Sequence, residues 1–174
     1  MAMIPFRHTG AAALLIMTLG AGQALAEGTD PELLGEFGDW AAYTFKASDT
    51  KVCYISSRPK ASDPANVKRD PTFFLVTTMP GRKVKGEIST IIGYPFKKDS
   101  TAKLAIDQTQ FELFTNADGA WADSTAAEKK IVAAMRSGQS LSVTGTSARG
   151  TQTVDTYSLN GVSAALAKID ETCK

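Results

Sequence analysis

The sequence predicts one mainly-β domain, a β-sandwich or barrel with two short helices, the last at the C-terminus. Three observations predict this class. Short runs rich in aromatic and β-branched residues recur along the chain, and Gly, Pro, Asp or Ser bounds each run. Two further segments carry apolar residues at helical spacing. No internal repeat or linker divides the chain.

Strands are predicted wherever aromatic and β-branched residues cluster. The ranges are Trp40–Lys46, Lys51–Ser56, Thr72–Thr78, Glu87–Tyr94, Leu104–Asp107, Gln110–Thr115, Ser140–Thr146 and Thr151–Leu159. The fifth and sixth ranges form one hairpin, and the last two form another across residues 147–150. Between the second and third, residues 57–71 make a long polar loop, which is either a solvated insertion or a functional segment.

Two helices interrupt the strands. The first runs from about Ala126 to Arg136, with a capping box over Thr125–Glu128 and Gly138 near its end. Its apolar face carries Ile131, Val132 and Met135. The second begins after Asn160 as the N-cap and places Val162, Ala165, Leu166 and Ile169 on one face. Cys173 follows on that same side, where a disulfide would tie the terminal helix to the strand that carries Cys53.

The first 26 residues have the layout of a cleavable secretory signal. Arg7 and His8 give a basic start, and Ala11–Leu19 is an apolar stretch too short to span a bilayer. Ala24–Ala26 then shows the small-x-small pattern that a signal peptidase cleaves. The alternative is an uncleaved anchor, but the polar run after Ala26 favours release. We expect residues 1–26 to be removed and residues 27–174 to form the exported domain.

The composition of that domain excludes several function classes. Without Arg7 it would hold 18 basic and 18 acidic residues, a balance that argues against a nucleic-acid binder. The chain's one histidine, His8, would leave with the signal. Ser-His-Asp and Cys-His catalysis then become impossible, and transition-metal sites lose their commonest ligand. We therefore expect no metal and no cofactor.

Cys53 and Cys173 are the two cysteines of the chain. In an oxidising compartment two such residues most simply bond to each other, closing a loop of 120 residues. Two free thiols, or bridges between molecules, remain the alternatives.

Basic residues are concentrated in one part of the chain. Residues 46–103 hold twelve bases against five acids. If their loops cluster at one end of the domain, they make a cationic patch that attracts phosphates, acidic glycans or lipid headgroups. The alternative is a set of solubilising residues scattered over strand edges. The candidate contacts for an anionic ligand are Arg58, Lys60, Lys68, Arg69, Arg82, Lys83, Lys97 and Lys98.

A carboxylate pair is the remaining catalytic candidate. Asp118 and Asp123 flank Gly119-Ala120-Trp121, and an aromatic residue beside two acids is typical of a sugar-processing cleft. Asp118-Gly119 is also an ordinary tight turn, and Trp121 an ordinary core residue, which is the favoured interpretation.

Several segments, taken in order, resemble the invasion-associated locus B family of secreted bacterial proteins. They are Gly38-Asp39-Trp40, Val52–Ile55 with Arg58-Pro59-Lys60, Ile91–Ser100, Gly119–Trp121, Gly145–Gly150, and Asp155–Gly161 with the closing helix and Cys173. The resemblance implies an immunoglobulin-like β-sandwich in the bacterial envelope, in the periplasm or on the outer surface. It also implies a role, in pathogens, in entry into host cells.

One departure from the family pattern bears on the disulfide. Many members have a cysteine shortly after the Asp-Trp pair, where this chain has Tyr43-Thr44. A local bond to Cys53 is thus absent, which supports the long-range bond to Cys173.

From these observations we expect a non-enzymatic binding domain that contacts an envelope or host-surface component, such as an anionic glycan or lipid. The alternatives are a carboxylate-dependent, glycan-processing envelope enzyme and a purely structural envelope subunit.

Overall fold

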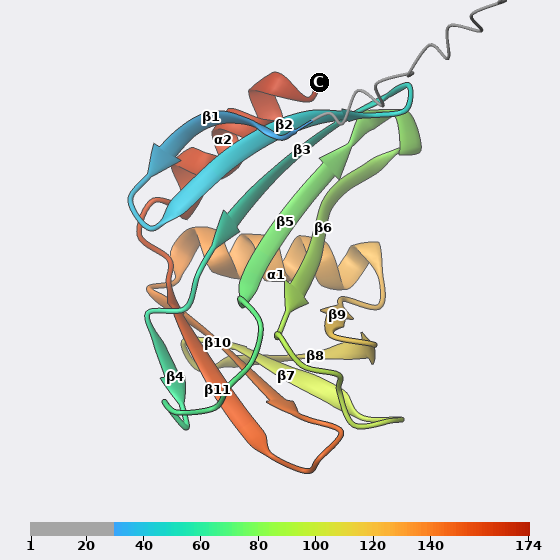
Figure 1. The fold of residues 1–174 in the computed structure, drawn as a ribbon. Helices are drawn as coiled ribbons and strands as arrows, with labels where there is room; N and C mark the ends of the chain where they lie inside the picture. The colour runs from blue at the N-terminus through green and yellow to red at the C-terminus, as the bar shows by residue number, and fades with distance from the viewer. Residues whose placement is uncertain (1–29) are drawn as a thin grey trace, which may run out of the picture.

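The computed structural model describes residues 30–174 (Figure 1), so the expected signal peptide lies outside the described residues and stays a prediction. Within residues 30–174 the chain forms eleven strands, one 3-10 turn and two α-helices. Their bounds are β1 Glu32–Phe37, β2 Trp40–Ala47, β3 Thr50–Ser57, β4 Ala61–Asp63, β5 Phe73–Met79, η1 Pro80–Arg82, β6 Val84–Ile91, β7 Thr101–Ile106, β8 Thr109–Asn116, β9 Gly119–Trp121, α1 Thr125–Ser137, β10 Ser140–Thr146, β11 Gln152–Ser158 and α2 Val162–Thr172. The mainly-β class with two helices, the last near the C-terminus, is confirmed.

The strands form one antiparallel sheet in the order β1-β2-β3-β5-β6-β9-β8-β7-β10-β11-β4. The short strand β9 pairs with β6 on one side and β8 on the other, and the sheet folds over there (Figure 1). The two halves meet in the core, where the rings of Phe74 on β5 and Tyr157 on β11 lie 5.8 Å apart. Trp40 on β2 also donates a 2.9 Å hydrogen bond from Nε1 to the carbonyl of Ser158. The halves therefore face each other as the layers of a sandwich.

Helix α1 crosses behind β5 and β6 in Figure 1, and α2 packs against β1, β2 and β3. Helix α1 buries Ile131 and Met135, as its apolar spacing predicts. Its N-cap is Ser124, whose Oγ accepts a 3.3 Å hydrogen bond from the N–H of Ala127. The predicted capping box at Thr125 is therefore wrong by one residue.

Helix α2 buries the four predicted apolar residues, but its N-cap is Gly161 rather than Asn160. Gly161 has a φ of +89°, in the left-handed region that favours glycine. A Cβ at this position would lie 1.9 Å from the carbonyl oxygen of Phe37. The turn before α2 therefore packs directly on the β1–β2 hairpin, and only glycine fits there.

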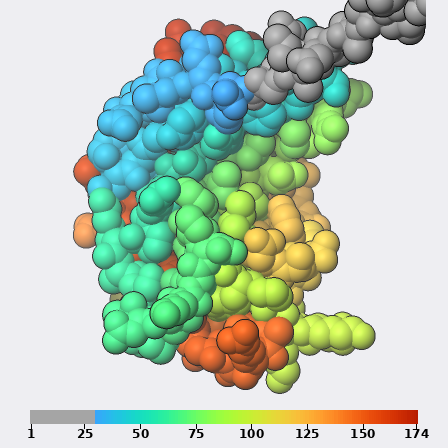
Figure 2. Space-filling view, in the orientation of Figure 1, coloured from blue at the N-terminus to red at the C-terminus, as the bar shows by residue number. Residues whose placement is uncertain are grey.

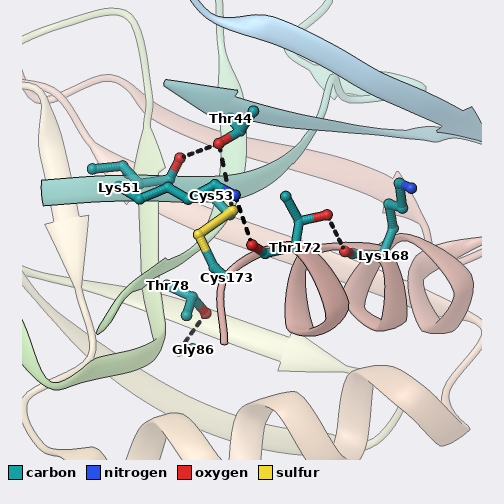
Figure 3. The surroundings of a disulfide bond; sticks show 9 residues. Thr44, Lys51, Cys53, Thr78, Gly86, Lys168, Thr172 and Cys173 are labelled. Carbon is teal, nitrogen blue, oxygen red and sulfur yellow. Dashed lines mark hydrogen bonds between the residues drawn. A yellow bond between two sulfur atoms is a disulfide. The ribbon is translucent and has the colours of Figure 1, made fainter. Parts of the chain in front are cut away.

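The disulfide between Cys53 and Cys173 is present in the structure, with Cα atoms 6.0 Å apart (Figure 3). It joins the middle of β3 to the residue that follows α2. Lys51 reinforces the same junction, since its Nζ donates a 2.8 Å hydrogen bond to the carbonyl of Thr172. The terminal helix is thus held on the sheet both covalently and by its apolar face.

The sequence pattern does not predict three of the observed strands, namely β1, β4 and β9. The predicted strand over Glu87–Tyr94 also ends early, at Ile91. The cause is Gly93, with a φ of +79°, where a Cβ would lie 2.1 Å from the carbonyl oxygen of Asp70. The chain turns at that close approach. Neither helix within residues 30–174 is long and apolar enough to cross a membrane.

Candidate binding surface

The predicted basic residues do not all lie at one end of the sheet. Arg82 and Lys83 lie in the turn between β5 and β6. Arg58 and Lys60 instead follow the end of β3, which pairs with the start of β5, and Lys97 and Lys98 follow β6. Because neighbouring antiparallel strands alternate in direction, the β5–β6 turn is at the opposite end from the other loops. One cluster of all eight candidates is therefore not formed.

Arg69 is not a surface residue. Its side chain is 9% exposed and forms a salt bridge with Asp155 on β11, which is fully buried. Nη1 donates to Asp155 Oδ2 at 2.7 Å and to the carbonyl of Ile92 at 3.0 Å, and Nη2 donates to Ser62 Oγ at 3.0 Å. Hydrogen bonding to Asp155 raises the pKa of the Arg69 guanidinium above its ordinary value. Arg69 therefore holds the loop after β4 on the sheet, and its buried guanidinium is not accessible to a ligand at the surface.

The same ion pair corrects the interpretation of residues 57–71 as a solvated insertion. This segment contains β4, which pairs with β11 at the far edge of the sheet. Ser62 on β4 also donates a 2.7 Å hydrogen bond to Asp155 Oδ1. The segment thus runs from β3 to the far edge of the sheet, where β4 pairs with β11, and then returns to β5 beside β3.

Arg58 and Lys60 line a hollow of about 400 Å³ beside Tyr43 and Phe73. The Arg58 guanidinium lies over the Phe73 ring, 5.0 Å from its centroid. Lys60 forms a salt bridge with Asp39, and the hydrogen bond from Lys60 lowers the pKa of the Asp39 carboxyl. Both cations are exposed, but each already has a partner within the chain.

A second hollow, of about 310 Å³, lies between three segments near the turn that joins β10 to β11. They are the loop that carries Lys68, the loop after β6 at Tyr94 and Pro95, and the turn between β10 and β11 that carries Arg149. Backbone hydrogen bonds fix the last two together, from Ala148 N–H to the Pro95 carbonyl at 2.8 Å and from the N–H of Lys97 to the carbonyl of Thr146 at 2.9 Å. In Figure 2 the orange turn lies beside the yellow-green loop.

We call the residues Lys68, Lys97, Lys98 and Arg149 the basic end. All four are exposed, and Lys68 and Arg149 line the hollow itself. Lys97 and Lys98 follow Pro95 by two and three residues. None of the ion pairs within residues 30–174 includes any of the four. The sequence pattern missed Arg149 because it lies outside the basic block, although the turn that carries it was predicted.

Asp118 and Asp123 lie at opposite ends of β9, and both are exposed. Asn116 pairs with Gly119 across a turn of Ala117 and Asp118, so the predicted tight turn is present one residue earlier. Asp123 accepts a 2.9 Å hydrogen bond from the hydroxyl of Ser124. The strand thus separates the two acids.

Trp121 is not a core residue. Its neighbour Ala120 points into the core, so Trp121 lies on the outer face of β9, where successive side chains alternate. There its ring stacks on Phe114, with centroids 5.7 Å apart.

Comparison with known proteins places the chain in a family. The family model described as invasion associated locus B (IalB) protein matches residues 40–170. The crystal structure of invasion associated protein B from Bartonella henselae has a TM-score of 0.56 and 19% sequence identity to this chain, and the match covers 79% of this chain and 96% of that one. That likeness shows a shared fold. No curated protein sequence matches. The resemblance seen in the sequence is confirmed, and the chain belongs to the invasion associated locus B family.

Proposed function

We propose that this protein is an exported, non-enzymatic binding module of the bacterial envelope, which holds an anionic component of the envelope or of a host surface at its basic end. The ligand carries phosphate or carboxylate groups, as an acidic glycan or a lipid headgroup does. Whether that component belongs to a host surface or to the bacterial envelope decides between a role in host-cell invasion and one in envelope maintenance.

One observation carries the proposal: four exposed cations that take part in none of the ion pairs within residues 30–174 lie on the three segments that form this hollow, and two of them, Lys68 and Arg149, line it. Three segments far apart in the sequence supply them, and backbone hydrogen bonds hold two of these segments together. Asp99, next to Lys98, offsets one of the four charges. A local excess of positive charge raises the concentration of anions near a surface and speeds their association.

Two further observations support export. The disulfide buried between β3 and α2 is the kind of bond that persists in an oxidising compartment. The expected signal over residues 1–26 would deliver the chain there.

The test compares two charge-reversed variants of the exported domain. The double variant Lys68→Glu/Arg149→Glu alters the basic end, and Arg82→Glu/Lys83→Glu makes the same change in net charge at the opposite end of the sheet. Binding is measured by co-sedimentation with vesicles that contain anionic phospholipid, and separately by retention on a sulfated polysaccharide column.

We expect the first variant to lose binding about tenfold or more while the second keeps it, because only the first removes cations from the hollow. Binding of the unaltered domain should also weaken as salt is raised, because the Debye length falls from about 30 Å at 0.01 M to about 8 Å at 0.15 M. Equal losses in both variants, or binding that is indifferent to salt, would contradict the proposal.

A further inference from the structure

A groove of about 660 Å³ lies between α1, β6 and α2, away from the basic end. Its apolar lining comes from all three elements, with Val84 on β6, Val132 and Ala133 on α1, and Leu166 and Ile169 on α2. Volume and lining are in the range of pockets that bind small ligands.

A β-bulge shapes the middle of the groove. The register between β5 and β6 shifts at Thr78, and Gly86 there has a φ of +77°. The N–H of Gly86 bonds to Thr78 Oγ1 at 3.3 Å, and a Cβ at Gly86 would touch Val132 at 3.5 Å. The strand backbone thus passes close to α1 at this point, and charged residues lie on either side of it along the strand.

One end of the groove is acidic. Glu87 on β6 and Glu128 in the first turn of α1 both line it and are half-buried. Neither takes part in an ion pair within residues 30–174. Burial, and then the charge of Glu87, raise the pKa of the Glu128 carboxyl. Lys129, next to Glu128, lines the groove as well, so the two carboxylates exceed the cations at this end by one. That excess favours a ligand that brings a positive charge.

The other end is basic. Lys85 on β6 and Arg136 in the last turn of α1 both pair with Asp170 on α2, at 3.6 Å and 3.2 Å. Two cations sharing one carboxylate leave one positive charge in excess, and Lys83 lines the groove as well. This end favours a ligand that brings a negative charge.

The two ends are separated along α1 by the eight residues from Glu128 to Arg136, about 12 Å of helix. We propose that the groove binds an extended peptide of three or four residues with free ends. Its amino group lies between Glu87 and Glu128, and its carboxylate lies at Lys85 and Arg136. At about 3.3 Å per residue such a peptide spans the separation, and its apolar side chains cover Val132.

Charge complementarity selects this ligand over simpler amphiphiles. A fatty acid would match the basic end but leave Glu87 and Glu128 unneutralised. A cationic amphiphile would match the acidic end but meet Lys85 and Arg136. A zwitterion of this length satisfies both ends at once. The proposal does not depend on the anion-binding function of the basic end.

The test titrates the exported domain by calorimetry with the peptide Ala-Val-Leu-Ala in four forms: free at both ends, acetylated, amidated, and capped at both ends. We expect one free-ended peptide to bind per domain. Each cap should weaken binding about tenfold or more, since a hydrogen bond to a charged group contributes roughly that factor.

Variants assign each end. In Glu87→Gln/Glu128→Gln, acetylation should no longer matter while amidation still does. In Lys85→Gln/Arg136→Gln the reverse is expected. Lys130→Gln, on α1 but outside the groove lining, is the matched control and should behave as the unaltered domain. Thermal unfolding confirms that each variant is folded.

Three results would overturn the proposal. They are absence of binding by the folded domain, equal affinity for free-ended and doubly capped peptides, and tighter binding of laurate than of the peptide.

Discussion

The disulfide between Cys53 and Cys173 offers the sharpest test of how the fold is stabilised, through the double substitution Cys53→Ala/Cys173→Ala. The bond spans a sequence separation of 120 residues. In the chain-entropy model, a loop of that length destabilises the unfolded chain by about 5 kcal/mol at 25 °C. A domain of this size loses about 3 °C of melting temperature per kcal/mol, so the variant should melt about 15 °C lower.

The assay is urea unfolding followed by circular dichroism. The reduced, unaltered domain is the control, because it lacks the bond but keeps both sulfur atoms in their buried positions. Reduction and substitution should lower the free energy of unfolding by similar amounts, with a small extra loss from the alanine voids. Hydrogen exchange should show α2 as the element whose protection falls most.

A loss below about 1 kcal/mol in both forms would show that the loop constraint contributes almost nothing to stability, contrary to this prediction. Two titratable thiols in the domain as isolated would refute the bond itself.

Three further predictions concern single positions. Asp155→Ala leaves Arg69 buried without its counter-ion, so urea unfolding should show a loss of about 3–5 kcal/mol; a loss below 1 kcal/mol would contradict the account. Gly161→Ala should cost far more than Gly150→Ala in melting temperature, because both have positive φ but only the Cβ at Gly161 meets backbone; equal shifts would contradict this. Glu128→Gln should stabilise the domain at neutral pH. A pKa raised in the folded state means that unfolding releases protons, so the wild-type carboxylate lowers stability as pH rises. The advantage should vanish below the ordinary glutamate pKa of 4.5, and an advantage that persists there would count against it.

Much of the fold could be predicted from the sequence because its strands follow the alternating pattern. In β2, for example, Trp40, Ala42 and Thr44 point inward while the residues between them are less buried. The apolar spacing of α1 and α2 likewise identifies their buried faces. Local patterns of this kind depend only on which face meets the core.

Two of the three strands that were missed, β4 and β9, depend on distant partners. β4 has three residues and exists because it pairs with β11, and β9 exists because it lies between β6 and β8. Neither has a periodic pattern long enough to recognise. The N-caps at Ser124 and Gly161 were each missed by one residue, since several neighbouring residues suit a cap chemically.

The candidate site was predicted only in part, because charge counts carry no information about partners. Arg69 and Lys68 are neighbours in the sequence, yet Arg69 is paired to the buried Asp155 and Lys68 is exposed beside a hollow. The contribution of Arg149 depends on the contact of its turn with Pro95, which pairs distant segments. The structure thus divides a basic block into paired residues and unpaired ones.

The most direct measurement for the proposed function is an NMR titration of the isotope-labelled domain with a short sulfated oligosaccharide. We expect amide shifts confined to residues 67–68, 93–98 and 147–151, the three segments of the basic end. Shifts centred on Arg82 and Lys83, or spread evenly over all exposed lysines, would contradict the proposed function.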